Sequence, residues 1–213
     1  MSFMEMLETQ RVVPVLRVDS ANVAEFVVHA MARGGMRLVE LTATTPDVLR
    51  TVRRFRDRPD VVIGVGTVET VDMVDQAVDA GARFLVTYRP AEEVAQRARS
   101  LDVPYVLGGL TPAEVARCRD LGSPIVKIFP ANLVGSTYLN ALRGPLPGVR
   151  FMPTGGIRLG DVGAWIRAGA TAVGIGGELV GKEPWDEAAQ DAIVKRCQAV
   201  LRAGQHGTLH NAD

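Results

Sequence analysis

Lys127 is the residue of this chain best suited to covalent chemistry, because it interrupts an apolar run with the character of a buried strand. The run, 124–130, is rich in Ile and Val. The other two lysines, Lys182 and Lys195, fall in the polar C-terminal part. Burial disfavours the ammonium form of a lysine, and the neutral amine can attack a carbonyl and form a Schiff base. A lysine on an exposed edge strand or in a structural ion pair is the alternative interpretation.

Glu40 interrupts a second apolar run, 38–41, in the same way, and Arg17 ends a third. A carboxylate beside an amine can take up and return protons, and a guanidinium binds a carboxylate in bidentate fashion. Glu40 and Lys127 could instead form a purely structural salt bridge. A buried pair adds little net stability, so a chemical role is the favoured interpretation.

The elements that must position these residues form a regular series. Short runs rich in Val, Ile and Leu alternate with amphipathic stretches of helical period, which is typical of repeated βα units with parallel strands. The expected strands are 12–18, 38–43, 61–68, 84–89, 105–110, 125–130, 150–155 and 172–177. Eight units of this size predict one α/β domain, a single-domain (β/α)8 TIM barrel over residues 1–204. An open doubly wound sheet is the alternative fold.

Helix boundaries and the end of the chain carry their own signals. Thr111-Pro112-Ala113-Glu114 is typical of a capped helix start, and Gly81 and Gly169 are expected to end helices. Residues 205–213 are polar and are predicted to form a frayed tail.

The barrel prediction brings the reactive residues together. Active sites of such barrels lie at the C-terminal ends of the strands, and side chains from even-numbered strands share interior layers. Glu40 belongs to the second expected strand and Lys127 to the sixth, so we expect them to meet, with Arg17 nearby. Gly155-Gly156 and Gly176-Gly177 follow the seventh and eighth strands, where backbone N–H groups of barrels often bind phosphate. Tight turns are the alternative role for these glycines.

Composition excludes several function classes. The chain has 213 residues, 47% hydrophobic residues and no formal net charge, which gives no electrostatic case for a nucleic-acid or membrane partner. No apolar stretch approaches the span of a bilayer, so we expect a cytoplasmic protein. Cys118 and Cys197 show no metal-like or disulfide pattern and are interpreted as packing residues. The histidines do not cluster, so no metal site is expected.

The order and spacing of five segments resemble one enzyme family over nearly the whole chain. The segments are VPVLR at 13–17, VELT at 39–42, GVGTV at 64–68, VKIFPA at 126–131 and MPTGGI at 152–157. The chain is similar to the class I pyruvate-type aldolases that cleave 2-keto-3-deoxy-6-phosphogluconate and 4-hydroxy-2-oxoglutarate. The resemblance implies a lyase that makes pyruvate and an aldehyde without a metal or organic cofactor, on a barrel that typically assembles as a homotrimer.

The resemblance also implies roles for individual residues. Lys127 matches the Schiff-base lysine and Glu40 the carboxylate that moves protons through a water. The remaining matches are expected to bind the substrate: Arg17 and Thr67 around the pyruvate carboxylate, Phe129 and Thr154 in the pocket wall, and Gly155, Gly156, Gly176 and Gly177 in the phosphate-binding turns.

Departures from the family pattern leave the substrate open. Many members carry a phosphate-binding serine in the turn where this chain has Gly177 followed by Glu178. A non-phosphorylated substrate therefore stays an alternative. Tyr88 and Arg89 also differ from the family at the pocket rim. A sugar-phosphate isomerase or epimerase barrel, which would leave Lys127 unexplained, and a catalytically inactive trimeric scaffold complete the alternatives.

Overall fold

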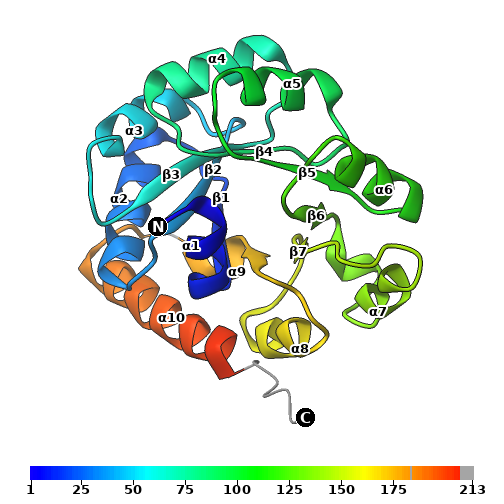
Figure 1. The fold of residues 1–213 in the computed structure, drawn as a ribbon. Helices are drawn as coiled ribbons and strands as arrows, with labels where there is room; N and C mark the ends of the chain where they lie inside the picture. Colours follow the sequence, from blue (N-terminus) through cyan, green and yellow to red (C-terminus); the bar gives the residue numbers. More distant parts are fainter. Residues whose placement is uncertain (183, 207–213) are drawn as a thin grey trace.

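The computed structural model describes residues 1–182 and 184–206, which form a barrel of eight parallel strands (Figure 1). Neighbouring strands pair in the order β7-β6-β5-β4-β3-β2-β1-β8. The strands are β1 (Val12–Leu16), β2 (Leu38–Thr42), β3 (Val62–Gly66), β4 (Leu85–Val86), β5 (Tyr105–Gly109), β6 (Val126–Ile128), β7 (Phe151–Pro153) and β8 (Val173–Ile175). Each lies within one of the eight runs expected from the sequence. The single-domain (β/α)8 prediction is confirmed, and the open doubly wound alternative is wrong.

The barrel closes between β7 and β8 by one backbone bridge. Thr154, just after β7, pairs in parallel with Gly174 of β8. A Cβ atom on residue 174 would lie 2.3 Å from Oγ1 of Thr154, so glycine makes room for the Thr154 side chain where the barrel closes. The rest of the sheet is held by regular parallel ladders, such as the one that pairs Leu38 to Thr42 with Val62 to Gly66.

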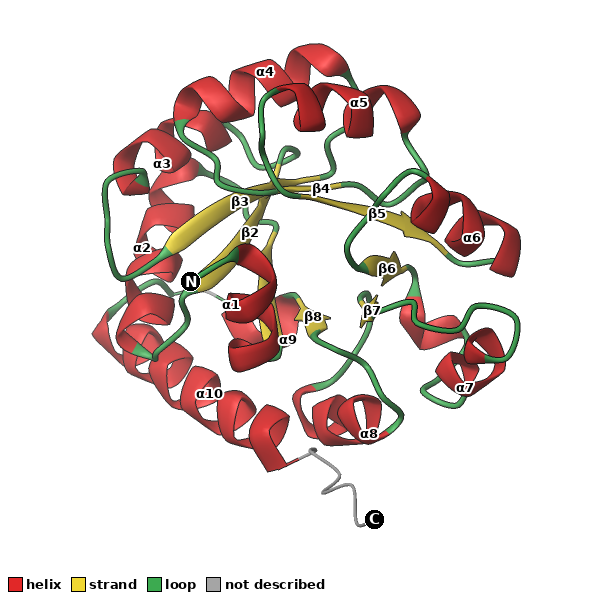
Figure 2. Ribbon diagram, in the orientation of Figure 1, coloured by secondary structure: helices red, strands yellow, loops and turns green. Residues whose placement is uncertain are grey.

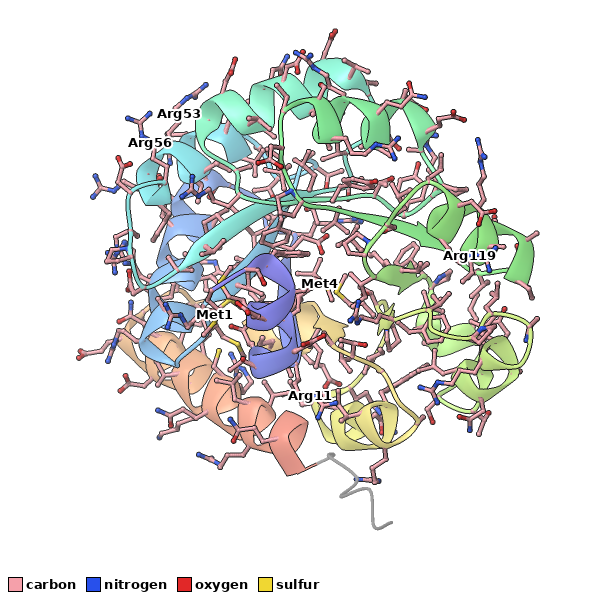
Figure 3. The ribbon with its side chains drawn as sticks, in the orientation of Figure 1. Met1, Met4, Arg11, Arg53, Arg56 and Arg119 are labelled. Carbon is pink, nitrogen blue, oxygen red and sulfur yellow. The ribbon has the colours of Figure 1, made fainter. Side chains whose placement is uncertain are left out.

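Helices surround the barrel as an outer layer (Figure 2). Apolar side chains of the strands and helices form the main core between the two layers. On the outer layer, the charged side chains of Arg53 on α3 and Arg56 just after it point outward in Figure 3. The surrounding helices are α2 (Ala21–Arg33), α3 (Val48–Phe55), α4 (Val71–Ala80), α5 (Glu92–Ser100), α6 (Pro112–Asp120), α7 (Tyr138–Arg143), α8 (Val162–Arg167) and α10 (Glu187–His206), with the short α9 (Gly177–Val180) after β8 and the 3-10 turns η1 (Ala131–Leu133) and η2 (Leu159–Asp161).

A further helix, α1 (Phe3–Gln10), precedes β1 and lies over the opening of the barrel seen in Figure 1. Its Phe3 and Leu7 belong to a second apolar cluster, which also contains barrel residues such as Val13 and Phe84. The rings of Phe3 and Phe84 lie 5.0 Å apart. The helix therefore closes the N-terminal end of the barrel. The sequence analysis did not identify this helix, because its polar residues hide a short apolar face.

The helix boundary signals are present as expected. Thr111 caps α6, since its side chain accepts from the Glu114 N–H while the Glu114 carboxylate accepts from the Thr111 N–H. Gly81 ends α4 in the left-handed conformation. The last helix continues through His206, so residues 205 and 206 of the predicted tail are helical; residues 207–213 lie outside the described part of the chain.

Both cysteines are buried and unpaired, as packing residues should be. Burial raises the pKa of Cys118 to about 12, and burial likewise raises the pKa of Cys197 to about 12. Both thiols are therefore protonated at neutral pH and unreactive as nucleophiles. Among the described residues, no helix has the length and hydropathy that crossing a bilayer requires.

Candidate active site

The strand ends open into a cavity of about 560 Å³ that contains every residue the sequence analysis selected. Several of these residues directly follow a strand, as Arg17 follows β1 and Phe129 follows β6. At this point the backbone leaves the ladder and a side chain can turn into the mouth of the barrel. The selected residues in the lining are Arg17, Glu40, Thr67, Lys127, Phe129, Thr154, Gly155, Gly156, Gly176 and Gly177.

Lys127 and Glu40 form a buried pair in this cavity. Nζ of Lys127 donates to Oε1 of Glu40 at 3.2 Å, with 7% and 0% of the two side chains exposed. The second carboxylate oxygen, Oε2 of Glu40, is buried and has no hydrogen-bond partner among the residues that the structure describes. A buried carboxylate oxygen left without a partner costs free energy. A polar partner, such as a water or a substrate hydroxyl, would satisfy this oxygen.

Gly66 makes room for the Glu40 carboxylate. A Cβ atom on residue 66 would lie 2.0 Å from Oε1 of Glu40 and within 2.8 Å of two further Glu40 atoms. Such contacts are impossible, so a side chain on residue 66 would move the carboxylate away from Lys127. The glycine at the end of β3 is visible in the sequence, but the side chain that it accommodates is not.

We predict that Gly66→Ala lowers any activity that depends on the Lys127–Glu40 pair by about a hundredfold, since small misplacements of a catalytic group have effects of that size. Gly160→Ala is the matched control, because a Cβ atom on residue 160 meets nothing within 4 Å. Steady-state rates and melting temperatures of the two variants would be compared. Equal activity of Gly66→Ala and the control would contradict this view of Gly66.

Phe129 and Tyr88 form an aromatic wall beside the lysine. Nζ of Lys127 lies 5.7 Å from the centre of the Phe129 ring, within the range of a cation–π contact. The Tyr88 ring lies 6.5 Å from that of Phe129, and its hydroxyl donates to Glu69. That hydrogen bond raises the pKa of Tyr88, with a smaller contribution from the charge of Glu69. The Tyr88 hydroxyl is therefore engaged at the rim.

Arg17 and Thr67 lie at the same mouth. Arg17 is exposed and makes no ion pair or hydrogen bond with any residue in the described part of the chain, so its guanidinium is available to an anion. Thr67 has a backbone φ of 60°, a left-handed conformation that is rare for a β-branched residue. Strained backbone of this kind concentrates at functional sites. By contrast Arg89 does not line the cavity, because it pairs with Glu93 at 2.6 Å.

Thr154, Gly155 and Gly156 form the wall after β7. Thr154 is buried, and its hydroxyl donates to the Met152 carbonyl at 3.2 Å. Gly155 and Gly156 have φ values of 97° and 67°. A Cβ atom on residue 156 would lie 2.5 Å from Cγ of Asn132. Glycine is therefore required at position 156 both by the positive φ and by the lack of space for a side chain.

Two further charged residues, Arg158 and Glu178, also line the cavity. Glu178 was singled out from the sequence but Arg158 was not, although its place two residues after a glycine pair at a strand end was a usable signal. Oε2 of Glu178 accepts from the N–H of Leu159 at 2.7 Å, so this carboxylate caps η2. Arg158 donates to Asp161 through Nε and Nη2 at 2.9 and 3.3 Å.

A larger cavity, of about 720 Å³, lies elsewhere and is a weaker candidate. It is bounded by α3, α4 and the loop after β2, with Arg50 and Arg53 among its charged residues. Arg50 is already paired with Glu25 at 3.4 Å. This cavity contains neither Lys127 nor Glu40, so the strand-end cavity is the better candidate active site.

Comparison with known proteins identifies the family. The family model described as "KDPG and KHG aldolase" matches residues 3–196. The chain belongs to this aldolase family. A relative from Treponema pallidum, 2-dehydro-3-deoxy-phosphogluconate aldolase, is 35% identical over 76% of this chain and 78% of its own.

Solved structures of similar chains agree with the family assignment. A KDPG aldolase from Legionella pneumophila, with pyruvate captured as a covalent carbinolamine, has a TM-score of 0.85 at 27% identity over 94% of this chain and 98% of its own. A cube-shaped, porous protein cage designed by fusing symmetric oligomeric domains has a TM-score of 0.84 at 25% identity over 92% of this chain and 73% of its own. The prediction of a class I, Schiff-base pyruvate aldolase, an aldehyde-lyase, is confirmed by membership of the KDPG and KHG aldolase family.

Proposed function

We propose that this protein reversibly cleaves a 2-keto-3-deoxy-4-hydroxy acid to pyruvate and an aldehyde, with Lys127 as the nucleophile and Glu40 as the proton-transfer group. One observation carries the assignment of these roles. A single buried lysine lies 3.2 Å from a fully buried carboxylate inside an open, strand-end cavity. The KDPG and KHG names of the matched family support the choice of a keto acid substrate.

Schiff-base formation begins with a proton transfer. Oε1 of Glu40 accepts a proton from Nζ of Lys127, and the neutral amine attacks the keto carbon of the substrate. The resulting alkoxide takes that proton back from Glu40, and Glu40 then removes a proton from the positively charged nitrogen, which gives the neutral carbinolamine. Glu40 returns this proton to the hydroxyl group, which leaves as water and gives an iminium on Lys127, and the positive nitrogen becomes the electron sink for the next step.

Carbon–carbon cleavage requires a base at the 4-hydroxyl. Glu40, acting through a water, takes the hydroxyl proton while the C3–C4 bond breaks and its electron pair enters an enamine on Lys127. The aldehyde leaves first. Protonation of the enamine at C3 and hydrolysis of the iminium then release pyruvate and restore the free amine. The steps use only side chains of this chain and water.

The remaining residues are proposed to orient the substrate. Arg17, which makes no ion pair within the described residues, is placed to hold the keto acid carboxylate, with Thr67 beside it. Phe129 and Thr154 form the apolar and polar sides of the pocket wall. The glycine pairs 155–156 and 176–177 bring backbone close to the aldehyde half of the substrate.

The proposal also covers the oligomeric state and the cellular location of the protein. A homotrimer stays our prediction, and the similarity to a chain used in a cage of symmetric oligomeric domains supports self-association. A cytoplasmic location and the absence of nucleic-acid and membrane partners also stay predictions. The oligomer would be measured by light scattering at several protein concentrations.

Trapping of the pyruvate adduct tests the proposal without any choice of aldehyde. Incubation with pyruvate and borohydride is expected to add one reduced pyruvate per chain, and peptide mass spectrometry is expected to place it on Lys127. Omission of pyruvate is the control. A folded protein that gives no adduct, or an adduct on Lys182 or Lys195 instead, would refute the assignment of the nucleophile.

A further inference from the structure

The short connection between β3 and α4 carries a strained residue of the active-site cavity. Residues 67–70 alone link the two elements. Thr67, the first of them, lines the cavity with a backbone φ of 60°, and its hydroxyl makes no hydrogen bond with the described residues. A left-handed β-branched residue persists only where the surrounding structure holds it. The contacts of this connection therefore determine where the Thr67 hydroxyl lies.

These contacts come from β4 and the loop that follows it. Directly after the strained threonine, the N–H of Val68 donates to the carbonyl of Val86 in β4 at 3.1 Å. The next residue is bound twice. The carboxylate of Glu69 accepts from the Tyr88 hydroxyl, and the Glu69 carbonyl accepts from Nη2 of Arg89 at 3.0 Å. Two consecutive residues of the connection are thus bound to the neighbouring strand and its loop.

Tyr88 is itself held in place from the side of β5. The N–H of the preceding residue, Thr87, donates to the carbonyl of Val106 in β5 at 2.9 Å. A Cβ atom on residue 108 would lie 2.7 Å from Cα of Tyr88, so the backbone of Tyr88 packs directly on Gly108. The tyrosine is therefore fixed to β5, and its hydroxyl in turn holds Glu69.

The hydrogen bond between Tyr88 and Glu69 acts locally. Both residues are exposed, so water can satisfy both groups when the bond is lost, and no buried polar atom is left without a partner. The global stability of the barrel therefore depends little on this bond. The conformation of the four-residue connection depends on it directly.

We propose that Tyr88 and Glu69 are positioning residues, which hold the Thr67 hydroxyl where the carboxylate of the keto acid binds. This inference rests on the proposed function, in which Thr67 lies beside that carboxylate. The Tyr88 hydroxyl acts through Glu69, and Glu69 acts through the short backbone that joins it to Thr67. Without the hydrogen bond, only a fraction of the molecules holds Thr67 in the binding conformation. The apparent affinity for the keto acid falls by that fraction, whereas the rate at saturation is kept.

Tyr88→Phe tests the proposal, because phenylalanine keeps the ring in the cavity wall and removes only the hydroxyl. Exchange of the pyruvate methyl protons in deuterated water requires the iminium and the enamine but no aldehyde, so it gives KM and kcat for pyruvate alone. We expect KM to rise by about threefold to tenfold while kcat stays within about twofold, as for the loss of one hydrogen bond that selects a binding conformation. Tyr138→Phe is the matched control, since the Tyr138 hydroxyl donates to the Leu110 carbonyl and neither residue lines the cavity.

Further variants test the route from Tyr88 to Thr67. Glu69→Gln keeps an acceptor for the Tyr88 hydroxyl and should resemble the native protein, whereas Glu69→Leu should resemble Tyr88→Phe. In a Thr67→Val background, Tyr88→Phe should raise KM no further, because the hydroxyl that it positions is already gone. A native KM in Tyr88→Phe, an equal rise in Tyr138→Phe, or a full additional rise in the Thr67→Val background would overturn the proposal. Absence of proton exchange in the native protein would instead refute the proposed reaction, so the two failures are distinguishable.

Discussion

Lys127→Arg is expected to abolish aldol cleavage, with a loss of at least about 10⁴-fold, although the variant keeps a positive charge opposite Glu40. A guanidinium stays protonated at all accessible pH values and cannot form an iminium. The measurement pairs steady-state cleavage with borohydride trapping by pyruvate. Both signals should vanish together, since the covalent bond is the first step on the path.

The folded state of this variant is the necessary control. Arginine retains an ion pair to Glu40, which is fully buried, so the variant avoids an unpaired buried carboxylate. Lys195→Arg, in the last helix and away from the cavity, is the matched substitution. Near-normal turnover of Lys127→Arg would refute the Schiff-base mechanism. Loss of activity in Lys195→Arg would show that arginine substitution acts through stability.

Glu40→Gln is the second large expected effect, a decrease of about 10²- to 10⁴-fold in cleavage, which is the usual contribution of a positioned general acid or base. The amide keeps the volume that Gly66 leaves for the side chain but cannot take up a proton. Pyruvate should still be trapped on Lys127, more slowly than in the native protein, because the amine itself is intact. Separate measurement of trapping and cleavage rates distinguishes the two steps.

A second substitution distinguishes proton transfer from a structural role of Glu40. If Glu40 is the base, Glu40→Asp should retain more cleavage activity than Glu40→Gln, because aspartate keeps a carboxylate that can accept a proton. A purely structural role would make Glu40→Gln, which keeps the length of the side chain, the more active variant. If Glu40→Gln cleaved the substrate at the native rate, a group other than Glu40 would have to transfer the proton.

Much of the fold and of the candidate site could be predicted from the sequence, because their residues stand out from the apolar pattern of the strands. The strands of a parallel barrel are apolar on both faces, so Lys127 and Glu40 were visible as interruptions in apolar runs. Residues just beyond the ladders, such as Arg17 and Thr67, were predicted as parts of strands, since their apolar neighbours continue the pattern. The barrel geometry then placed all of them at one end.

Other features depended on contacts that no local pattern encodes. The need for glycine at position 66 comes from the Glu40 side chain of a neighbouring strand. The hydrogen bond from Leu159 of η2 to Glu178 of α9 joins segments that are far apart in the sequence, so the charge of Glu178 was visible but its partner was not. The helix α1 was missed because a short apolar face on a polar helix becomes recognisable only against the barrel interior.

The closure of the barrel by α1 blocks one of its two ends. Phe3 and Leu7 pack into the N-terminal end, so in the described part of the chain the cavity opens at the rim where Arg17 and Tyr88 lie. In the proposed mechanism pyruvate stays covalently bound to Lys127 after the C3–C4 bond breaks, so the aldehyde leaves through this opening first. Product release is therefore ordered, and aldehyde and pyruvate should give different inhibition patterns in steady-state kinetics.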